Sequence, residues 1–181
     1  MPYIQNSEAT VAYAPQLVAA EDAPSWQADE IAPRLFMGGT ADEDTVDKSR
    51  DLNEGAATDE YDAVATLYAW ARPAGSGTQE LRYGFMDGDL DLETVREVVN
   101  AAIWVHEHWT AGEKVLVRCQ AGLNRSGLVV ALVLMFDGLP AEEAINLLRE
   151  RRSRWALCNE AFVRWLIEEA DVKLRSSTGD E

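Results

Sequence analysis

The stretch 115–136 constrains the fold more than any other part of this chain, because it places a short polar loop between two strongly apolar segments. The apolar run Val115–Val117 is typical of a buried strand, and this strand ends at Cys119. Five residues then lead to Arg125, and residues 126–136 are apolar almost all round, as in a buried helix. The pattern predicts a strand, a tight loop and a helix, with a cysteine and an arginine at the two ends of the loop.

The loop from Cys119 to Arg125 has residue types suited to binding phosphate and attacking it. Backbone N–H groups of a curled loop at a helix N-terminus can converge on one centre and bind an anion. Such a nest favours a thiolate, whereas a free cysteine with a pKa of about 8.5 is mostly protonated near neutral pH. Arg125 can donate two hydrogen bonds to phosphate oxygens, and Gly122 lets the backbone turn where a Cβ would intrude. Ser126 can donate a hydrogen bond to the sulfur as it leaves a phosphocysteine.

The sequence Cys119-Gln-Ala-Gly-Leu-Asn-Arg125-Ser126 resembles the signature His-Cys-x-x-Gly-x-x-Arg-Ser/Thr of cysteine-dependent protein phosphatases, specifically their compact dual-specificity branch. Residues 31–38 resemble an early strand of that family, and residues 62–67 resemble a central strand. Residues 159–162, Asn-Glu-Ala-Phe, resemble the Asn-x-x-Phe segment that begins its last helix. The resemblance covers residues 30–170 and implies an α/β fold with a central, mostly parallel sheet flanked by helices.

The resemblance also implies the function of these residues. The expected activity is phosphomonoester hydrolysis of the protein tyrosine, serine and threonine phosphatase type, through a phosphocysteine on Cys119. Ser126 assists the departure of the sulfur, and Asn159 is a supporting residue. No metal or other cofactor is expected. The residues expected to bind phosphate are Gln120, Ala121, Gly122, Leu123, Asn124 and Arg125.

The same chemistry needs an acid that protonates the leaving oxygen, and family members carry an aspartate on a loop that precedes the cysteine. The acidic loop in the corresponding place runs from Phe85 to Asp91. Asp87 is the first choice, because its Asp-Gly setting resembles the general-acid loop of the family. Asp89 is the alternative, and Asp91 is well placed as the N-cap of a helix that begins near Leu92.

One position departs from the family pattern. Arg118 stands directly before the cysteine, where the family usually has a histidine. An arginine keeps a positive charge nearby but cannot copy the hydrogen-bond geometry of an imidazole. Two alternatives to an active phosphatase follow from these residues: a catalytically weak or inactive phosphate-binding module, which Arg118 favours, and a rhodanese-like sulfurtransferase, against which Arg125 and Asn159 argue.

Length and periodicity indicate one catalytic domain at residues 30–175, an N-terminal extension at 1–29 and a polar tail at 176–181. Apolar residues at helical spacing predict a helix at 92–110. A second helix is expected to open at Pro140. A last helix is expected around Phe162.

The net charge of −16 argues against nucleic acid and anionic membrane surfaces as partners. The sequence contains no apolar run long enough to span a bilayer and no signal-peptide pattern at its start. Two cysteines provide no disulfide framework, and a working thiolate suits a reducing compartment, so we expect a cytoplasmic protein. We expect a monomer whose partner is a phosphorylated protein or a small phosphomonoester.

Four arginines cluster between residues 149 and 154. They admit two interpretations. They either form a basic rim that attracts phosphorylated substrates or interact with the dipole at a helix C-terminus.

Overall fold

The computed structural model describes residues 27–40 and 58–171, which form a five-stranded sheet with the order β1-β2-β5-β3-β4. β1 and β2 pair antiparallel, and the other neighbouring strands pair parallel. The predicted α/β fold with a mostly parallel sheet is therefore confirmed. The strands are β1 (Asp29–Ala32), β2 (Leu35–Gly39), β3 (Ala63–Thr66), β4 (Gln79–Arg82) and β5 (Val115–Cys119).

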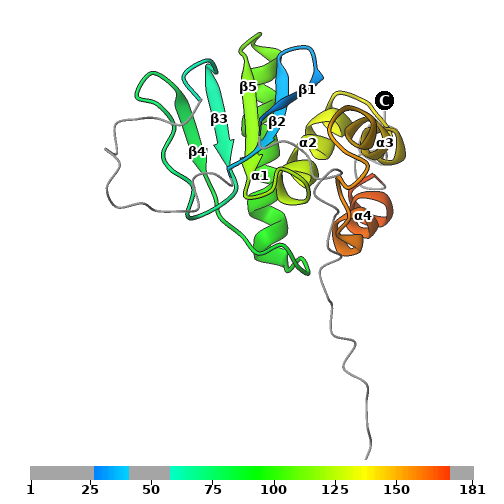
Figure 1. Ribbon diagram of the computed structural model, residues 1–181. Helices are drawn as coiled ribbons and strands as arrows, with labels where there is room; N and C mark the ends of the chain where they lie inside the picture. The colour runs from blue at the N-terminus through cyan, green and yellow to red at the C-terminus, as the bar shows by residue number, and fades with distance from the viewer. Residues whose placement is uncertain (1–26, 41–57, 172–181) are drawn as a thin grey trace, which may run out of the picture.

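The helices form two layers beside the sheet. α1 and α2 pack on the sheet and on each other, and α3 and α4 lie outside α2 (Figure 1). α2 is the central helix, and all of its residues except Phe136 are buried. The predicted bounds of α1 are confirmed, and Pro140 stands at the N-cap of α3. The helices are α1 (Leu92–Thr110), α2 (Arg125–Phe136), α3 (Ala141–Arg151) and α4 (Glu160–Trp165), which continues as the π-helix η2 (Leu166–Ala170).

Strand β5 directs its side chains alternately to the two faces of the sheet, as the pleat of a strand requires. Val115, Val117 and Cys119 belong to the large core that the helices cover. Leu116 belongs to a smaller cluster on the opposite face. Arg118 has the same parity as Leu116, so its side chain leaves the strand on the face away from that of Cys119.

Two parts of the sheet differ from the sequence-based expectation. The single early strand expected at 31–38 is a hairpin, in which β1 and β2 turn at Pro33 and Arg34. Arg34 has a φ of 69°, in the left-handed region that lets a chain reverse in a tight turn. Strand β4 was not expected, because its four residues are half-exposed or exposed and show no alternation of apolar side chains.

Arg118 is buried in a polar network on the face of the sheet opposite to Cys119. Its Nε donates to Thr66 Oγ1 at 2.9 Å, and its Nη2 donates to Arg72 O and lies 3.4 Å from Glu80 Oε1. The Thr66 hydroxyl donates to the same Glu80 oxygen at 2.6 Å. The positive charge expected near the thiol therefore lies on the opposite face of the strand from Cys119, where Glu80 pairs with it.

The network lowers the pKa of Glu80. Burial opposes its negative charge, but hydrogen bonds from the Thr66 hydroxyl and the Ala74 N–H, with the charges of Arg82 and Arg118, outweigh the cost of burial. The ionised form of Glu80 is therefore favoured more in the folded chain than in the unfolded chain. This preference stabilises the folded state above the ordinary carboxyl pKa, and the stabilisation is lost as the pH falls through the lower folded-state pKa.

Within the described residues, no helix is both long enough and apolar enough to cross a membrane. The predicted extension lies outside the described residues apart from its last three positions, and the predicted tail lies wholly outside them. The domain boundaries therefore stay predictions.

We expect Glu80→Gln to lower the free energy of unfolding by about 2 kcal/mol at neutral pH, because it leaves the buried Arg118 cation without its counter-charge. The stabilisation by Glu80 is complete above its ordinary pKa of 4.5 and is lost as the pH falls through the lower folded-state value. Urea unfolding of parent and variant from neutral pH to well below 4.5 measures this difference, which should shrink as the solution becomes more acidic.

The matched control is Glu60→Gln, because Glu60 pairs with Lys114 at 2.7 Å while its side chain is 60% exposed. Exposed pairs contribute at most about 1 kcal/mol. Equal losses for both variants, or a Glu80→Gln loss that does not change with pH, would contradict the proposed pairing of Glu80 with Arg118.

Candidate active site

The candidate site lies where the carboxyl ends of the parallel strands β3 and β5 meet the N-terminus of α2. Cys119, the last residue of β5, is only 2% exposed. Its Sγ lies 3.4 Å from the Oγ of Ser126, which is fully buried in the first turn of α2. The structure therefore brings the predicted nucleophile and its predicted hydroxyl partner into contact.

Four backbone carbonyls of the loop accept hydrogen bonds from residues outside the loop. Gln120 O accepts from Thr40 N at 2.9 Å, and Gly122 O accepts from the Nε of Arg152 at 3.0 Å. Leu123 O accepts from Leu157 N, and Asn124 O accepts from Leu128 N inside α2. Because a carbonyl and the following N–H point in opposite directions, this arrangement turns N–H groups of the loop inward.

The inward side of the loop is suited to an anion. Within the described part of the chain, no hydrogen bond is donated by the N–H groups of Ala121, Gly122, Leu123 or Asn124. N–H groups of this kind at a helix N-terminus form a ready site for phosphate oxygens.

Gly122 allows the loop to close, because its φ of 67° lies in the left-handed region. A Cβ at this position would lie 2.4 Å from the carbonyl carbon of Gly38 and 2.6 Å from the nitrogen of Gly39. The loop therefore packs directly on the end of β2, and both backbone conformation and space require a glycine.

Arg125 carries a buried positive charge at the first position of α2. Its Nη1 donates to Phe85 O at 3.2 Å and to Leu67 O at 3.4 Å, and its guanidinium lies 5.2 Å from the ring centre of Tyr68. Its Nε is buried and has no hydrogen-bond partner among the described residues. Arg125 has no carboxylate in ion-pair range in the described ranges 27–40 and 58–171.

The other two arginines that are buried in the described part of the chain both have carboxylate partners. Arg118 contacts Glu80, and Arg152 contacts Asp29 at 2.6 Å. A buried guanidinium without a counter-ion is costly, so Arg125 favours binding of an anion beside Cys119.

Asp87 is held directly beside the loop. One carboxylate oxygen accepts from Asn124 Nδ2 at 2.9 Å, and the other accepts from Asn159 Nδ2 at 2.8 Å. Asp89 is exposed and makes no hydrogen bond or ion pair with any described residue. Asp91 accepts from Thr94 N at 2.7 Å as the N-cap of α1. The geometry thus favours Asp87 over Asp89 as the acid and bears out the N-cap function of Asp91.

Asn159 is placed by the backbone that precedes it. Leu157 has a φ of 54°, which is unusual for a bulky residue. Two hydrogen bonds hold this conformation: the Leu157 N–H donates to Leu123 O, and the Leu157 carbonyl accepts from Arg149 Nη2. The chain then turns into α4, where Asn159 is the N-cap and accepts from Ala161 N at 2.9 Å. The predicted supporting residue therefore reaches Asp87 from a rigid helix start.

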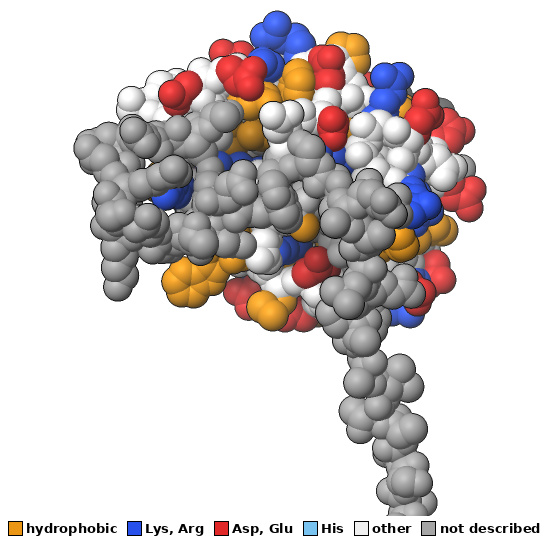
Figure 2. Space-filling view, in the orientation of Figure 1, with side chains coloured by type: hydrophobic (Ala, Val, Ile, Leu, Met, Phe, Trp, Pro, Cys, Tyr) orange, Lys and Arg blue, Asp and Glu red, His pale blue; other side chains and the backbone are white. Residues whose placement is uncertain are grey.

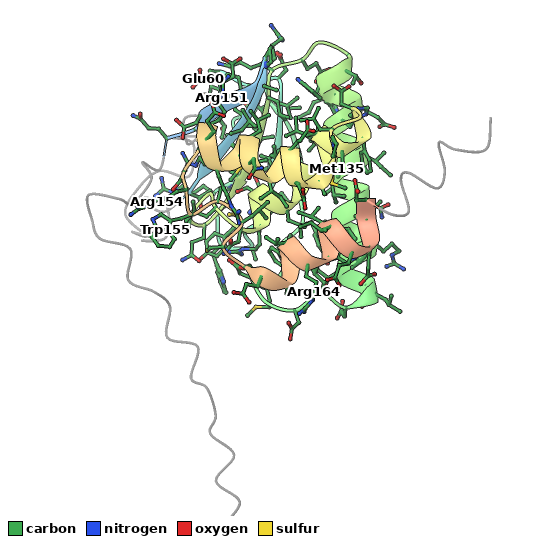
Figure 3. The ribbon with its side chains drawn as sticks, turned by 90° about the vertical axis from the view of Figure 1, so that its right-hand side faces the viewer. Glu60, Met135, Arg151, Arg154, Trp155 and Arg164 are labelled. Atoms are coloured by element: carbon green, nitrogen blue, oxygen red, sulfur yellow. The ribbon has the colours of Figure 1, made fainter. Side chains whose placement is uncertain are left out.

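Interaction with the dipole at a helix C-terminus fits Arg149 and Arg151, which lie in the last turn of α3, and attraction of phosphorylated substrates by the cluster stays a prediction. Arg149 binds backbone carbonyls of residues 156 and 157, and Arg152 fixes the carbonyl of Gly122. Arg151 and Arg154 are exposed, and Figure 3 shows both on the outside of the molecule at and beyond the end of α3. The face in Figure 2 shows acidic and basic side chains interspersed over the described residues.

Sequence reasoning missed two residues of the site. Tyr68, whose ring lies against Arg125, could have been found, because it follows β3 at the strand end adjacent to Cys119. Arg152 had no distinguishing signal, because neighbouring arginines share its sequence context. Only the tertiary contact with Gly122 separates it from them.

Comparison with known proteins agrees with this geometry. The family model described as "Dual specificity phosphatase, catalytic domain" matches residues 65–171, which include the whole loop. Mouse dual specificity protein phosphatase 12 is 31% identical over 156 residues, which cover 84% of this chain but 42% of the mouse protein. Human dual specificity protein phosphatase 26 is 25% identical over 183 residues, covering 97% of this chain and 82% of the human protein.

A solved structure shows the same fold. The crystal structure of a mouse putative dual specificity phosphatase, complexed with zinc tungstate, superimposes with a TM-score of 0.67 at 22% sequence identity. The superposition covers 91% of this chain and 99% of that chain.

We expect Gly122→Ala to lower the free energy of unfolding by more than about 3 kcal/mol, because it adds backbone strain and a contact with β2 that neither segment can relieve cheaply. Thermal unfolding measures this loss of stability. The folded part of the variant should also lose its affinity for vanadate, which calorimetry measures.

Gly112→Ala is the matched control, because Gly112 also has a positive φ, 88°, but has open space where the Cβ would lie. It should cost about 1 kcal/mol of strain and leave vanadate binding unchanged. The described packing of the loop is wrong if the two alanine variants prove equally stable.

Proposed function

The chain belongs to the dual-specificity phosphatase family, and from this membership we propose that it is a metal-independent phosphatase that hydrolyses phosphomonoesters through a phosphocysteine on Cys119. Protein phosphotyrosine, phosphoserine and phosphothreonine are the proposed substrates. The observation that carries the proposal is the buried Arg125 guanidinium, which has no carboxylate partner among the described residues, beside the inward N–H groups of the loop. Together they offer a dianionic phosphoryl group hydrogen bonds and an opposite charge next to the Cys119 sulfur.

In the first step, the Cys119 thiolate attacks phosphorus and the bond from phosphorus to the leaving oxygen breaks. Asp87 gives its proton to that oxygen, so the alcohol or phenol leaves neutral. Arg125 and the loop N–H groups bind the remaining phosphoryl oxygens, where negative charge is held throughout the transfer.

In the second step, water attacks the phosphocysteine, and Asp87 takes a proton from the water. The bond from sulfur to phosphorus breaks, and the Ser126 hydroxyl, 3.4 Å from Sγ, donates a hydrogen bond to the departing thiolate. Inorganic phosphate leaves, and both Asp87 and Cys119 return to their starting protonation states.

Arg118 gives little support to an inactive binding module. Its guanidinium contacts Thr66 and Glu80 on the face of the sheet opposite to Cys119. An arginine there can serve as a structural residue of β5 without occupying the phosphate site. We therefore place catalysis ahead of binding alone.

The side chains of Gln120, Ala121, Leu123 and Asn124 are uncharged, so the loop itself offers no additional cations for polyphosphorylated lipid headgroups. This favours a single phosphate group, carried by a protein or a small phosphomonoester. Both cysteines are free, and a nucleophilic thiolate persists in a reducing compartment, which supports a cytoplasmic location.

We expect hydrolysis of phenyl phosphate, whose leaving group needs a proton, that Cys119→Ser abolishes and Asp87→Asn lowers in kcat by roughly a hundredfold or more. Steady-state kinetics without added metal, and with a chelator present, measure both effects. Asp89→Asn is the matched control, because this carboxylate has no contact with the loop, and its kcat should stay within about twofold of the parent value.

Two outcomes would count against the proposal. Full turnover by Cys119→Ser would exclude a phosphocysteine. A parent protein that binds vanadate but shows no turnover would establish the binding module instead.

A further inference from the structure

We propose that the Asn124 side chain is a positioning residue for the general acid, a function separate from the contribution of its backbone to the phosphate loop. The inference rests on the proposed phosphatase function and deepens it. Asn124 ends the nucleophile loop, yet its amide reaches the acid loop and donates to Asp87 Oδ2 at 2.9 Å. The residue thereby joins the two loops that must act together on the same phosphate.

The side chain of Asn124 does not cap α2, although its position at the start of this helix suggests that function. Asn124 is the N-cap of α2, and asparagine is among the best residues for capping a helix through its side-chain oxygen. The structure shows no such capping bond from Asn124. Its Oδ1 instead accepts from Asn159 N at 3.1 Å and from Cys158 Sγ at 3.4 Å.

These contacts determine which end of each amide faces Asp87. Because the Asn159 N–H is a donor, the atom of Asn124 that receives it must be the oxygen, which leaves Nδ2 toward Asp87. The oxygen of Asn159 is likewise fixed by Ala161 N, which leaves its Nδ2 toward Asp87 Oδ1. Each carboxylate oxygen thus has one amide donor, and the two donors come from different elements.

Two donors on two oxygens restrict the carboxyl group more than either alone, because rotation about the last side-chain bond would break both. The backbone on either side of Asp87 is held elsewhere: Arg125 Nη1 donates to Phe85 O at 3.2 Å, and Asn159 Nδ2 donates to Gly88 O at 3.3 Å. The Asp87 side chain itself is exposed, so loss of the Asn124 amide should leave its carboxylate attached only through Asn159 and free to turn away from the leaving oxygen.

The test compares Asn124→Ala with the parent on two aryl phosphates that differ in their need for an acid. p-Nitrophenol leaves readily without a proton, whereas phenol does not. Because hydrolysis of the phosphocysteine is common to both substrates, the value to compare is kcat/KM, which reports the steps up to departure of the alcohol. We expect kcat/KM to fall about tenfold on phenyl phosphate and less than about threefold on p-nitrophenyl phosphate. Asn100→Ala, at an exposed position on α1, should change neither value.

A double-mutant cycle separates positioning from a general effect on the phosphate loop. In the Asp87→Asn background, Asn124→Ala should change kcat/KM on phenyl phosphate by less than about twofold, because the acid it positions is already gone. The proposal is overturned if Asn124→Ala lowers kcat/KM equally on both substrates, or lowers it as much in the Asp87→Asn background as in the parent.

A second measurement does not depend on turnover. NMR order parameters of the backbone at residues 84–90 should be lower in Asn124→Ala than in the parent, while vanadate affinity stays the same. If the parent proves to have no turnover, the proposed phosphatase function fails but lower order parameters still support positioning of Asp87 by Asn124. Unchanged order parameters at residues 84–90 would overturn the positioning claim whether or not the protein is an enzyme.

Discussion

The buried charge of Arg125 is the constraint on which the rest of the site depends. The other buried arginines, Arg118 and Arg152, have carboxylate partners, whereas the described residues offer Arg125 only carbonyl oxygens and the face of Tyr68. Carbonyl dipoles solvate a guanidinium but do not neutralise it. Binding of an anion supplies the missing negative charge and so stabilises the folded protein, and the loop provides the site for that anion next to Cys119.

The paired arginines hold the framework around this charge. Arg152 donates a hydrogen bond to the Gly122 carbonyl and so fixes this part of the loop, and Asp29 on β1 pairs with the charge of Arg152. Arg118 ties β5 to β3 and β4 from the face behind the nucleophile. Among the described residues, two buried arginines have carboxylate partners that offset the cost of burying their charge, and the third, Arg125, has none and faces the phosphate loop.

The sequence predicted the parts of the structure that local pattern determines. The strand, loop and helix around Cys119 and the bounds of α1 follow from runs of apolar residues and from a capping aspartate. The hairpin at Arg34 and strand β4 were missed, because the first depends on one left-handed residue and the second is a half-exposed edge strand. The partner of Arg118, Glu80, depends on the pairing of β5 with β3 and of β3 with β4, which no local pattern reveals. The contact between Asn124 and Asp87 joins loops far apart in sequence and could only be seen in three dimensions.

The measurement that tests the phosphocysteine mechanism most directly is rapid acid quenching of the protein during turnover of an aryl phosphate, followed by mass analysis of its peptides. A phosphoryl group bonded to the sulfur of Cys119, in larger amount when Asp87 is replaced by asparagine and dephosphorylation is slowed, is the expected result. Continued turnover with no phosphate on Cys119, or with phosphate on a different residue, would contradict the mechanism proposed from this site.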